Sequence, residues 1–285
     1  MRTQNAREAP VTRKDMAQDT DPSCMDLGLD GNAALVTAST SGLGLASARA
    51  LAREGANVSI CGRTESRLDE TKETIEADAA GDVMARQVDV TDPDEVRALV
   101  ETTAEAYGGI DHVVTSAGGV PSGAFLDMED RDWYQAYDTL VMSHVWTLRA
   151  AHPHLVESEA GSVVSITSTS VQEAIDGLVL SNAVRRAVVG TIDTIAREWA
   201  PEIRANVVMP GAHETPRIEE LIEQALDRGE YDSYDQGLTD WAAPIPLDRI
   251  GDPMELGDVV AFLASDRASF VTGATIPIDG GRTRS

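Results

Sequence analysis

The stretch Ala33-Ala-Leu-Val-Thr-Ala-Ser-Thr-Ser-Gly-Leu-Gly44 decides the fold of this chain. Its apolar start predicts a buried β-strand over Ala33–Ala38, and a helical pattern follows the glycines. Gly42 and Gly44 stand where the strand turns into the helix, and glycine there lets backbone amides approach a pyrophosphate. The N-terminus of a helix favours the same anion. The stretch therefore predicts a phosphate-binding turn at the end of a parallel strand.

Short β-branched apolar runs alternate with helical patterns along the rest of the chain. The predicted strands are Ala33–Ala38, Asn57–Cys61, Val83–Val88, His112–Ser116, Ser162–Thr167 and Arg204–Met209. Helices fill the gaps, and one begins at Asp92-Pro-Asp-Glu95, with Asp92 as cap and Glu95 closing a capping box. Continuous apolar strands separated by helices imply a parallel sheet covered on both faces. We predict an α/β fold with a single Rossmann-type, doubly wound parallel sheet and helices on both faces.

The charge balance of the chain is extreme. Its 285 residues include 48 acidic and 23 basic side chains, which gives a net charge of -25 and a pI of about 4.4. Nearly all the positive charge is arginine. This composition suggests a halophile's cytoplasmic protein, and an ordinary acidic protein is the alternative. Because the negative field repels phosphate backbones, we expect no nucleic-acid partner.

The polar, aperiodic residues 1–26 predict a disordered tail, ahead of one domain over residues 27–285. Met16 or Met25 is an alternative start of the chain. No apolar run approaches the length of a membrane span, and no hydrophobic signal region begins the sequence. Cys24 and Cys61 form neither a disulfide framework nor a metal-ligand spacing. We expect a soluble cytoplasmic protein with no membrane partner and no metal.

A series of segments resembles the motifs of one family in the expected order. These segments are Val36–Gly44, Asp89-Val90, Thr115-Ser-Ala-Gly118, Ser162–Ser168, Asn206–Gly211 with Thr215, and Asp279-Gly-Gly281. From Leu27 to Gly281 the chain resembles the short-chain dehydrogenase/reductase family. The resemblance implies an oxidoreductase that binds a nicotinamide dinucleotide, and a homodimer or homotetramer.

The resemblance also places the cofactor site. The implied cofactor-binding residues are Ser39, Ser41, Gly42, Leu43, Gly44, Arg63, Asp89, Val90, Ala117, Gly118 and Thr215. Arg63 follows the second strand, where it can meet a 2′-phosphate, and Cys61-Gly62 stands where NAD-preferring relatives often carry an acid. This favours NADP over NAD, although an ordinary surface arginine is the alternative reading of Arg63. The family's first loop glycine is Ala38 here, and its methyl group is tolerable only if φ stays negative.

The catalytic residues that the resemblance implies are Ser168, Ser181 and Arg185. The family reads Tyr-x-x-x-Lys where this chain has Ser181-Asn-Ala-Val-Arg185, and the tyrosine carries the proton. A spacing of four places Ser181 and Arg185 on one helix face. The family's catalytic asparagine falls on Leu140, so Ser168 alone is retained. Sub-groups labelled 3-oxoacyl-reductase-like are similar in sharing the Ser-x-x-x-Arg pattern.

Energetics decide what this replacement means. A tyrosine has a pKa of about 10, and poising it near 7 takes about 4 kcal/mol, which a nearby cation can supply. An alkyl hydroxyl is taken close to the value of water, about 15.7. Poising it near 7 takes on the order of 11 kcal/mol. Ser181 can therefore orient a substrate oxygen but cannot act as the general acid.

Another group must then carry the proton. The first candidate is His213, and the others are His144, Glu173 and Asp176. For each of them the favoured interpretation is a satisfied histidine or a solvated carboxylate, so no base is assigned. The irregular Thr215–Ile250 stretch corresponds to the family's flap over the substrate. Its Tyr231, Tyr234 and Trp241 either line a pocket or pack against a partner subunit.

These features predict an NADP-preferring oxidoreductase acting on a carbonyl or secondary alcohol of a small molecule, such as a 3-oxoacyl or sugar-derived substrate. One alternative is a lyase or dehalogenase-like enzyme on the same scaffold that has abandoned the nicotinamide. The other is a non-catalytic sensor that binds NADP(H).

Overall fold

The computed structural model describes residues 26–284, so the predicted tail lies, apart from its last residue, outside the described residues. Seven strands form one parallel sheet in the order β3-β2-β1-β4-β5-β6-β7. The strands are β1 (Ala33–Val36), β2 (Asn57–Gly62), β3 (Val83–Gln87), β4 (His112–Thr115), β5 (Ser162–Ile166), β6 (Arg204–Pro210) and β7 (Thr275–Ile278). The strand order reverses between β1 and β4, which leaves a crevice at the carboxyl ends of the strands. The predicted doubly wound α/β fold is confirmed.

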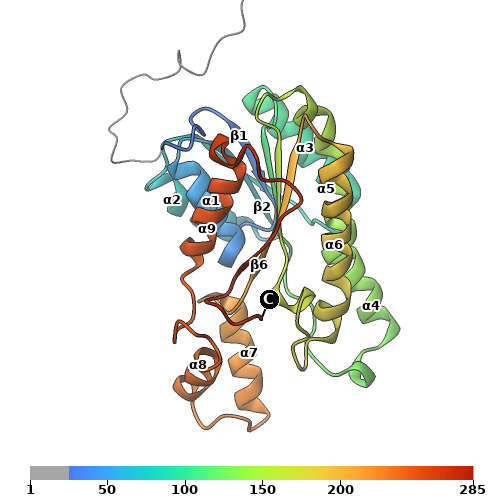
Figure 1. Cartoon of the computed structure of the whole chain (residues 1–285), viewed down its shortest axis with the longest axis vertical. Helices are drawn as coiled ribbons and strands as arrows, with labels where there is room; N and C mark the ends of the chain where they lie inside the picture. The colour runs from blue at the N-terminus through green and yellow to red at the C-terminus, as the bar shows by residue number, and fades with distance from the viewer. Residues whose placement is uncertain (1–25, 285) are drawn as a thin grey trace, which may run out of the picture.

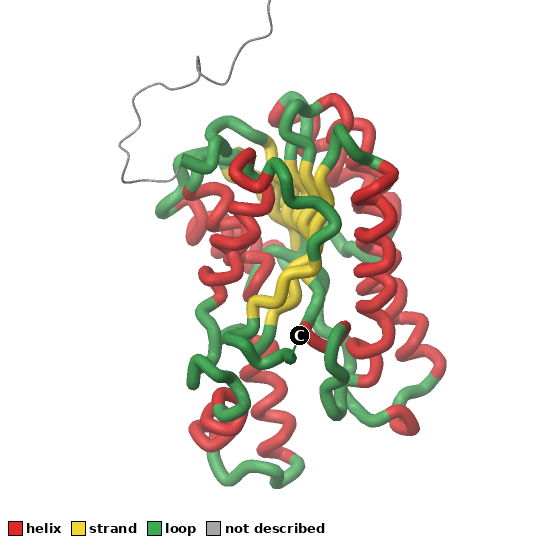
Figure 2. Tube along the Cα trace, in the orientation of Figure 1, coloured by secondary structure: helices red, strands yellow, loops and turns green. Residues whose placement is uncertain are grey.

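Helices cover both faces of this sheet (Figures 1 and 2). They are α1 (Gly42–Arg53), α2 (Glu65–Glu76), α3 (Pro93–Tyr107), α4 (Asp130–Tyr137), α5 (Ser143–Glu157), α6 (Val179–Glu198), α7 (Pro216–Asp227), α8 (Tyr234–Ala242) and α9 (Pro253–Ala264). Helices α1, α2 and α9 lie on one side in Figure 1, and α3, α5 and α6 lie on the other. Each side has its own buried apolar cluster against the strands.

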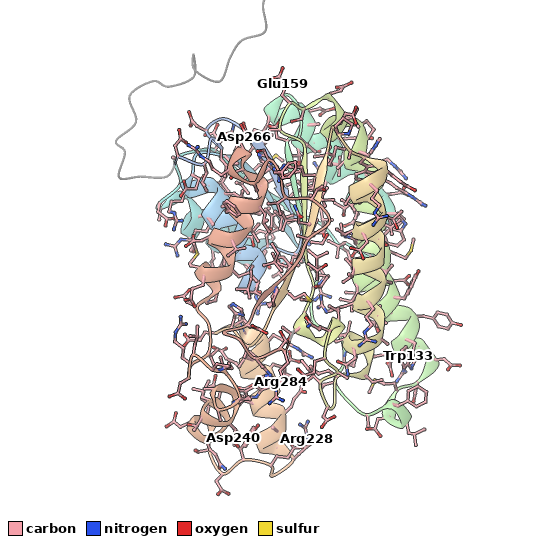
Figure 3. The ribbon with its side chains drawn as sticks, in the orientation of Figure 1. Trp133, Glu159, Arg228, Asp240, Asp266 and Arg284 are labelled. Atoms are coloured by element: carbon pink, nitrogen blue, oxygen red, sulfur yellow. The ribbon has the colours of Figure 1, made fainter. Side chains whose placement is uncertain are left out.

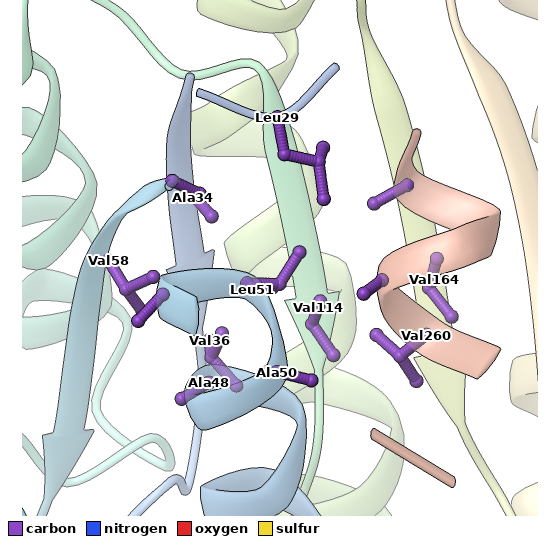
Figure 4. Packing of buried hydrophobic residues seen from close by; sticks show 14 of the residues in the cluster. Leu29, Ala34, Val36, Ala48, Ala50, Leu51, Val58, Val114, Val164 and Val260 are labelled. Atoms are coloured by element: carbon purple, nitrogen blue, oxygen red, sulfur yellow. The ribbon is translucent and has the colours of Figure 1, made fainter. Parts of the chain in front are cut away.

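Small residues let α1 and α9 pack closely beside β1. Ala48 and Leu51 of α1 are fully buried together with Val260 of α9, as Figure 4 shows. A Cβ atom at Gly257 of α9 would lie 2.5 Å from the carbonyl oxygen of Ala46, so only glycine permits this approach. This contact fixes the N-terminal end of α1, where the phosphate-binding turn lies.

The structure adds elements that the sequence analysis does not predict. β7 is a short edge strand with Pro277 in its middle, and a proline is tolerated there because its missing N–H faces no further strand. The stretch predicted as irregular, Thr215–Ile250, contains α7 and α8, which form the lower lobe in Figure 1. Ile218 and Ile222 are the buried centre of this lobe.

Within residues 26–284 no helix is both long and apolar enough to cross a membrane. The same residues contain no group of three or more histidine, cysteine, aspartate or glutamate side chains placed to hold a metal ion.

Candidate active site

The phosphate-binding turn has the predicted form. Ser41 is the N-cap of α1 but its side chain makes no capping hydrogen bond, so the first amides of the helix are not used by that side chain. Gly42 has a φ of +56°, in the left-handed region that favours glycine. A Cβ atom at Gly44 would lie 2.6 Å from the carbonyl oxygen of Ala38. This close, amide-lined turn at a helix N-terminus fits a pyrophosphate.

The expectation that φ of Ala38 must stay negative is wrong. Ala38 has a φ of +47°, so the chain adopts the left-handed conformation that a glycine would adopt freely. For an alanine this conformation costs on the order of 1–2 kcal/mol. The turn keeps its shape because Ser39, which is fully buried, holds it from inside: its hydroxyl donates to the Val36 carbonyl (2.8 Å) and accepts from the Cys61 amide (3.0 Å). The side chain of Ser39 therefore shapes the turn and does not line the cleft.

One cleft of about 260 Å³ opens at the carboxyl ends of the central strands; we call it the central cleft. It is bordered by the turn before α1, the loops after β4, β5 and β6, the start of α6 and the α7–α8 lobe. The predicted residues that it brings together are Ser41, Gly42, Leu43, Gly44, Ala117, Gly118, Ser168, Ser181, Arg185 and Thr215. The phosphate-binding turn and the predicted catalytic residues therefore line the same cleft. Arg63, Asp89 and Val90 do not line it.

Arg63 and Asp89 lie beyond β1, where β2 and β3 end. Asp89 accepts hydrogen bonds from the amide (2.9 Å) and hydroxyl (2.7 Å) of Thr91, and these together with the charge of Arg63 lower the pKa of its carboxyl. The amide of Asp89 donates to Glu95 (2.7 Å), so Glu95 does not close the predicted capping box with Asp92. Arg63 itself is exposed and carries no carboxylate partner within the described chain.

The end of β2 carries no acid. Cys61 is fully buried, and burial raises the pKa of its thiol to about 12. A Cβ atom at Gly62 would lie 2.4 Å from the Thr40 methyl carbon, so any side chain would have to displace Thr40. The space beside Arg63 is therefore free of the carboxylate that would repel a 2′-phosphate.

The serine positions meet at the end of β5. Ser168 caps the short turn Thr169–Val171 and accepts from the amide of Ser170 (3.1 Å). The hydroxyls of Ser170 and Ser181 lie 3.2 Å apart. The predicted convergence of strand end and helix is therefore present, and Ser170 is the residue through which Ser181 is held.

Residues 37–283 match a family model described as enoyl-(acyl carrier protein) reductase. The chain belongs to the short-chain dehydrogenase/reductase family. It is 32% identical over 254 residues to a 3-oxoacyl-[acyl-carrier-protein] reductase of Thermotoga maritima, covering 89% of this chain and 98% of the relative.

One further sequence relative and one solved structure are similar to this chain over most of its length. The chain is 31% identical over 262 residues to a 2-keto-3-deoxy-L-fuconate dehydrogenase of Xanthomonas campestris, covering 91% of this chain and 83% of the relative. A solved structure of L-sorbose reductase from Gluconobacter frateurii, complexed with NADPH and L-sorbose, has a TM-score of 0.86 and 29% identity. That likeness covers 92% of this chain and 100% of the reductase. This short-chain dehydrogenase/reductase is an oxidoreductase.

Arg185 is a half-buried cation that lines the central cleft. Burial, together with the positive charge of Arg217, lowers the pKa of its guanidinium to about 10, so it stays protonated at neutral pH. Its Nε is buried and finds no hydrogen-bond partner among the described residues. Leu140 is buried in the π-helical turn Asp138–Met142, where an apolar side chain can neither bind nor relay a proton.

The four candidate proton carriers separate cleanly. His213 lines the central cleft, its Nδ1 lies 3.3 Å from the Gly211 carbonyl oxygen, and burial lowers its pKa. His144 is buried outside the cleft lining, where its Nδ1 lies 3.0 Å from the Thr115 hydroxyl, and burial lowers its pKa to about 4. Glu173 and Asp176 are exposed and do not line the cleft.

Two cleft residues of the oxidoreductase have no counterpart in the sequence analysis. Arg217 lies two residues after Thr215, at the start of α7, and Arg282 follows the Asp279-Gly-Gly281 turn. Both are arginines directly after family motifs, a signal that could have identified them. Of the three flap aromatics only Trp241 lines the cleft, while Tyr231 and Tyr234 pack against the apolar centre of the lobe.

Proposed function

We propose that this oxidoreductase prefers NADP(H) and interconverts a carbonyl with a secondary alcohol on a small 3-oxoacyl or sugar-derived substrate. The observation that carries the proposal is the single cleft in which the phosphate-binding turn faces Ser168, Ser181 and Arg185. Support for the nucleotide comes from the NADPH-bound L-sorbose reductase and from the acid-free end of β2 beside Arg63. Support for the substrate class comes from the names of the relatives.

In reduction, a carbonyl, NADPH and one proton give an alcohol and NADP⁺. When bound, the nicotinamide supplies the hydride. Ser168 and Ser181 orient the carbonyl oxygen by hydrogen bonds, and the charge of Arg185 stabilises the negative charge that develops there. A desolvated cation is more effective in this role than an exposed one, because the local dielectric is low.

The proton takes a different route from the family's tyrosine. His213 is the candidate that lines the cleft. With Nδ1–H donating to the Gly211 carbonyl, its Nε2 carries the lone pair that accepts the proton of an alcohol during oxidation. In reduction the same nitrogen, once protonated, returns that proton to the developing alkoxide.

The experiment uses the full chain at low and at molar salt. Binding of NADPH and NADH is measured by calorimetry, and NADPH oxidation is followed with a panel of 3-oxoacyl thioesters and keto sugars. We expect tighter binding of NADPH than NADH and turnover of at least one substrate. Binding without any turnover would favour a sensor, and absence of binding would favour a nicotinamide-independent enzyme.

A further inference from the structure

The central cleft has a charge that is opposite to that of the rest of the molecule. The chain carries 48 acidic and 23 basic residues. Yet the described residues that line the cleft include three arginines, Arg185, Arg217 and Arg282, and no aspartate or glutamate. An acid-rich chain that keeps every carboxylate out of one cleft forms a local positive potential, and such a potential selects an anion.

Arg217 is already engaged in the structure, and the proposed function assigns a role to Arg185. Arg217 forms an ion pair with Glu220 (2.7 Å) and donates to the Val120 carbonyl oxygen (2.9 Å). Its guanidinium carbon would lie 3.2 Å from a Cβ atom at Gly119, so it packs on the loop after β4. Arg185 lies on the α6 face of Ser181, where the proposed function uses it at the carbonyl oxygen.

Arg282 is the arginine without such an engagement. Within residues 26–284 it has no ion pair with a carboxylate and its side chain donates no hydrogen bond. Its guanidinium carbon lies 6.0 Å from the centroid of the Trp241 ring on α8, at the limit of a cation–π contact. Arg282 therefore stands over an apolar wall with donors available to a ligand.

The backbone around Arg282 is held firmly. The carboxylate of Asp279 accepts from the amide of Gly281 (2.9 Å) and from the amide (2.8 Å) and hydroxyl (2.6 Å) of Thr283. The carbonyl oxygen of Arg284 accepts from Gln172 (3.1 Å), in the loop after the Ser168 turn. Figure 3 shows Arg284 at the junction of the α7–α8 lobe with the rest of the molecule. The C-terminal segment is thus tied at both sides of Arg282, which holds the main chain of Arg282 beside the cleft.

We propose that Arg282 binds a carboxylate of the substrate, so that the enzyme acts on an oxo acid and the matching hydroxy acid. The inference rests on the proposed function, because it needs the reacting carbonyl at Ser168 and Ser181. A planar guanidinium meets a carboxylate through two parallel hydrogen bonds. A neutral substrate would leave Arg282 covered by ligand and unpaired, which costs binding energy.

The test compares charged and neutral versions of each substrate. Short 3-oxo acids and sugar acids are assayed beside their methyl esters, in the wild-type enzyme and in Arg282→Gln. Loss of one charge-assisted contact predicts a KM for the acid that rises about 10- to 100-fold in the variant, with the ester unchanged. Arg282→Lys keeps the charge without the fork and restores part of the loss. Arg284→Gln, on the exposed neighbouring side chain, is the matched control and leaves both substrates unchanged.

Binding measurements show whether Arg282 contacts the substrate carboxylate or a phosphate of the cofactor. NADPH affinity is expected to stay within about twofold of wild type in Arg282→Gln, since the carboxylate contact belongs to the substrate alone. A tenfold loss of NADPH affinity would instead assign Arg282 to the cofactor and overturn the inference. Equal KM values for acid and ester in the wild-type enzyme would also overturn it, while leaving the proposed function intact.

A further measurement distinguishes failure of the proposed function from failure of the carboxylate site at Arg282. If the wild-type enzyme turns over no acid and no ester, calorimetry of acetoacetate and glucuronate with the NADP⁺-bound protein decides the matter. Acid binding that disappears in Arg282→Gln and persists in Arg284→Gln supports the carboxylate site even without turnover. Equal binding in all three proteins, or none in the wild type, contradicts it.

Discussion

The hydroxyl oxygens of Ser170 and Ser181 lie 3.2 Å apart, so these two serines share a hydrogen bond across the junction of the β5 end and α6. Ser170 also donates its amide to Ser168. Among the described residues that line the cleft there is no tyrosine. The sequence resemblance aligns the family's phenol with Ser181, an aliphatic hydroxyl that is already paired with a neighbour.

The first prediction returns a phenol to that position. Ser181→Tyr places a hydroxyl group of pKa about 10 beside Arg185, whose charge lowers that pKa. Because a positioned acid contributes about 10²- to 10⁴-fold to proton transfer, we expect kcat to rise at least tenfold. The pH profile of NADPH-dependent reduction should gain one ionisation that the wild-type enzyme lacks.

The matched control is Ser181→Phe, which adds the same ring without the hydroxyl. It should show no added ionisation and a kcat no higher than that of the wild type. Equal behaviour of the Tyr and Phe variants would show that proton transfer at this position does not limit the reaction.

The second prediction concerns His213, whose pKa is lowered by burial against the opposing effect of its hydrogen bond to Gly211 and the carboxylates of Glu255 and Asp252. A neutral His213 accepts a proton, so alcohol oxidation should slow as the pH falls through a pKa below the ordinary value of about 6.5. In His213→Gln the fall in the oxidation rate at low pH should vanish, and kcat should drop about 100-fold. Rates measured from acidic to neutral pH check this, and a fall that persists in the variant would belong to another group.

The third prediction tests the nucleotide preference at Arg63. Arg63→Gln removes the charge placed to meet a 2′-phosphate, and a lost contact of this kind costs about 1.5–3 kcal/mol. We expect the Kd for NADPH to rise about 10- to 100-fold, with the Kd for NADH unchanged, in a calorimetric titration. Arg67→Gln, on the exposed side chain one turn along α2, is the control. A parallel loss of both nucleotides in Arg63→Gln would contradict the assignment.

Local patterns were enough to predict the strands and the site loops. Most of the runs that form β1 to β6 are short and apolar, although β3 ends in Arg86 and Gln87, and Gly42 and Gly44 mark the turn before α1. β7 was not predicted because it is four residues long, half-buried and interrupted by Pro277. α7 could have been predicted, because Ile218, Leu221, Ile222 and Ala225 follow the helical spacing after Thr215-Pro216. α8 is harder to predict because it is only nine residues long and buries only Gly237.

What could not be predicted depends on contacts between distant segments. Arg282 reaches the cleft because Asp279 folds the C-terminal segment back, and Ser170 reaches Ser181 through a turn of three residues. The sign of φ at Ala38 follows from the buried hydrogen bonds of Ser39 to β1 and β2, which no local rule reports. Both His213 and His144 are buried, and only the fold shows that His213 lines the cleft while His144 does not.

The fourth prediction contrasts two glycines. In Gly44→Ala the new methyl group would meet the Ala38 carbonyl at 2.6 Å, so the phosphate turn must open and NADPH affinity should fall at least tenfold. In Gly190→Ala the methyl group on α6 meets nothing within 4 Å. That variant should gain about 0.5–1 kcal/mol in the free energy of unfolding and bind NADPH as the wild type does. Denaturation and nucleotide titration of both variants check the contrast, and comparable affinities would show that the turn tolerates a side chain.

The fifth prediction concerns stability in acid. Burial lowers the pKa of His144 to about 4, against about 6.5 in an unfolded chain. Between these two values the unfolded chain binds a proton at this position and the folded chain does not, so protonation favours unfolding as the pH falls. The contribution is complete above 6.5, is lost progressively down to about 4, and amounts to about 3 kcal/mol.

In His144→Asn an amide group can keep the contact with Thr115 without titrating. The variant should therefore lose less stability than the wild type between neutral pH and pH 4, by about those 3 kcal/mol. His154→Asn, on a half-exposed histidine of the same helix, is the control and should follow the wild-type curve. Urea denaturation at several pH values gives the free energies, and identical acid losses in His144→Asn and wild type would place the titrating group elsewhere.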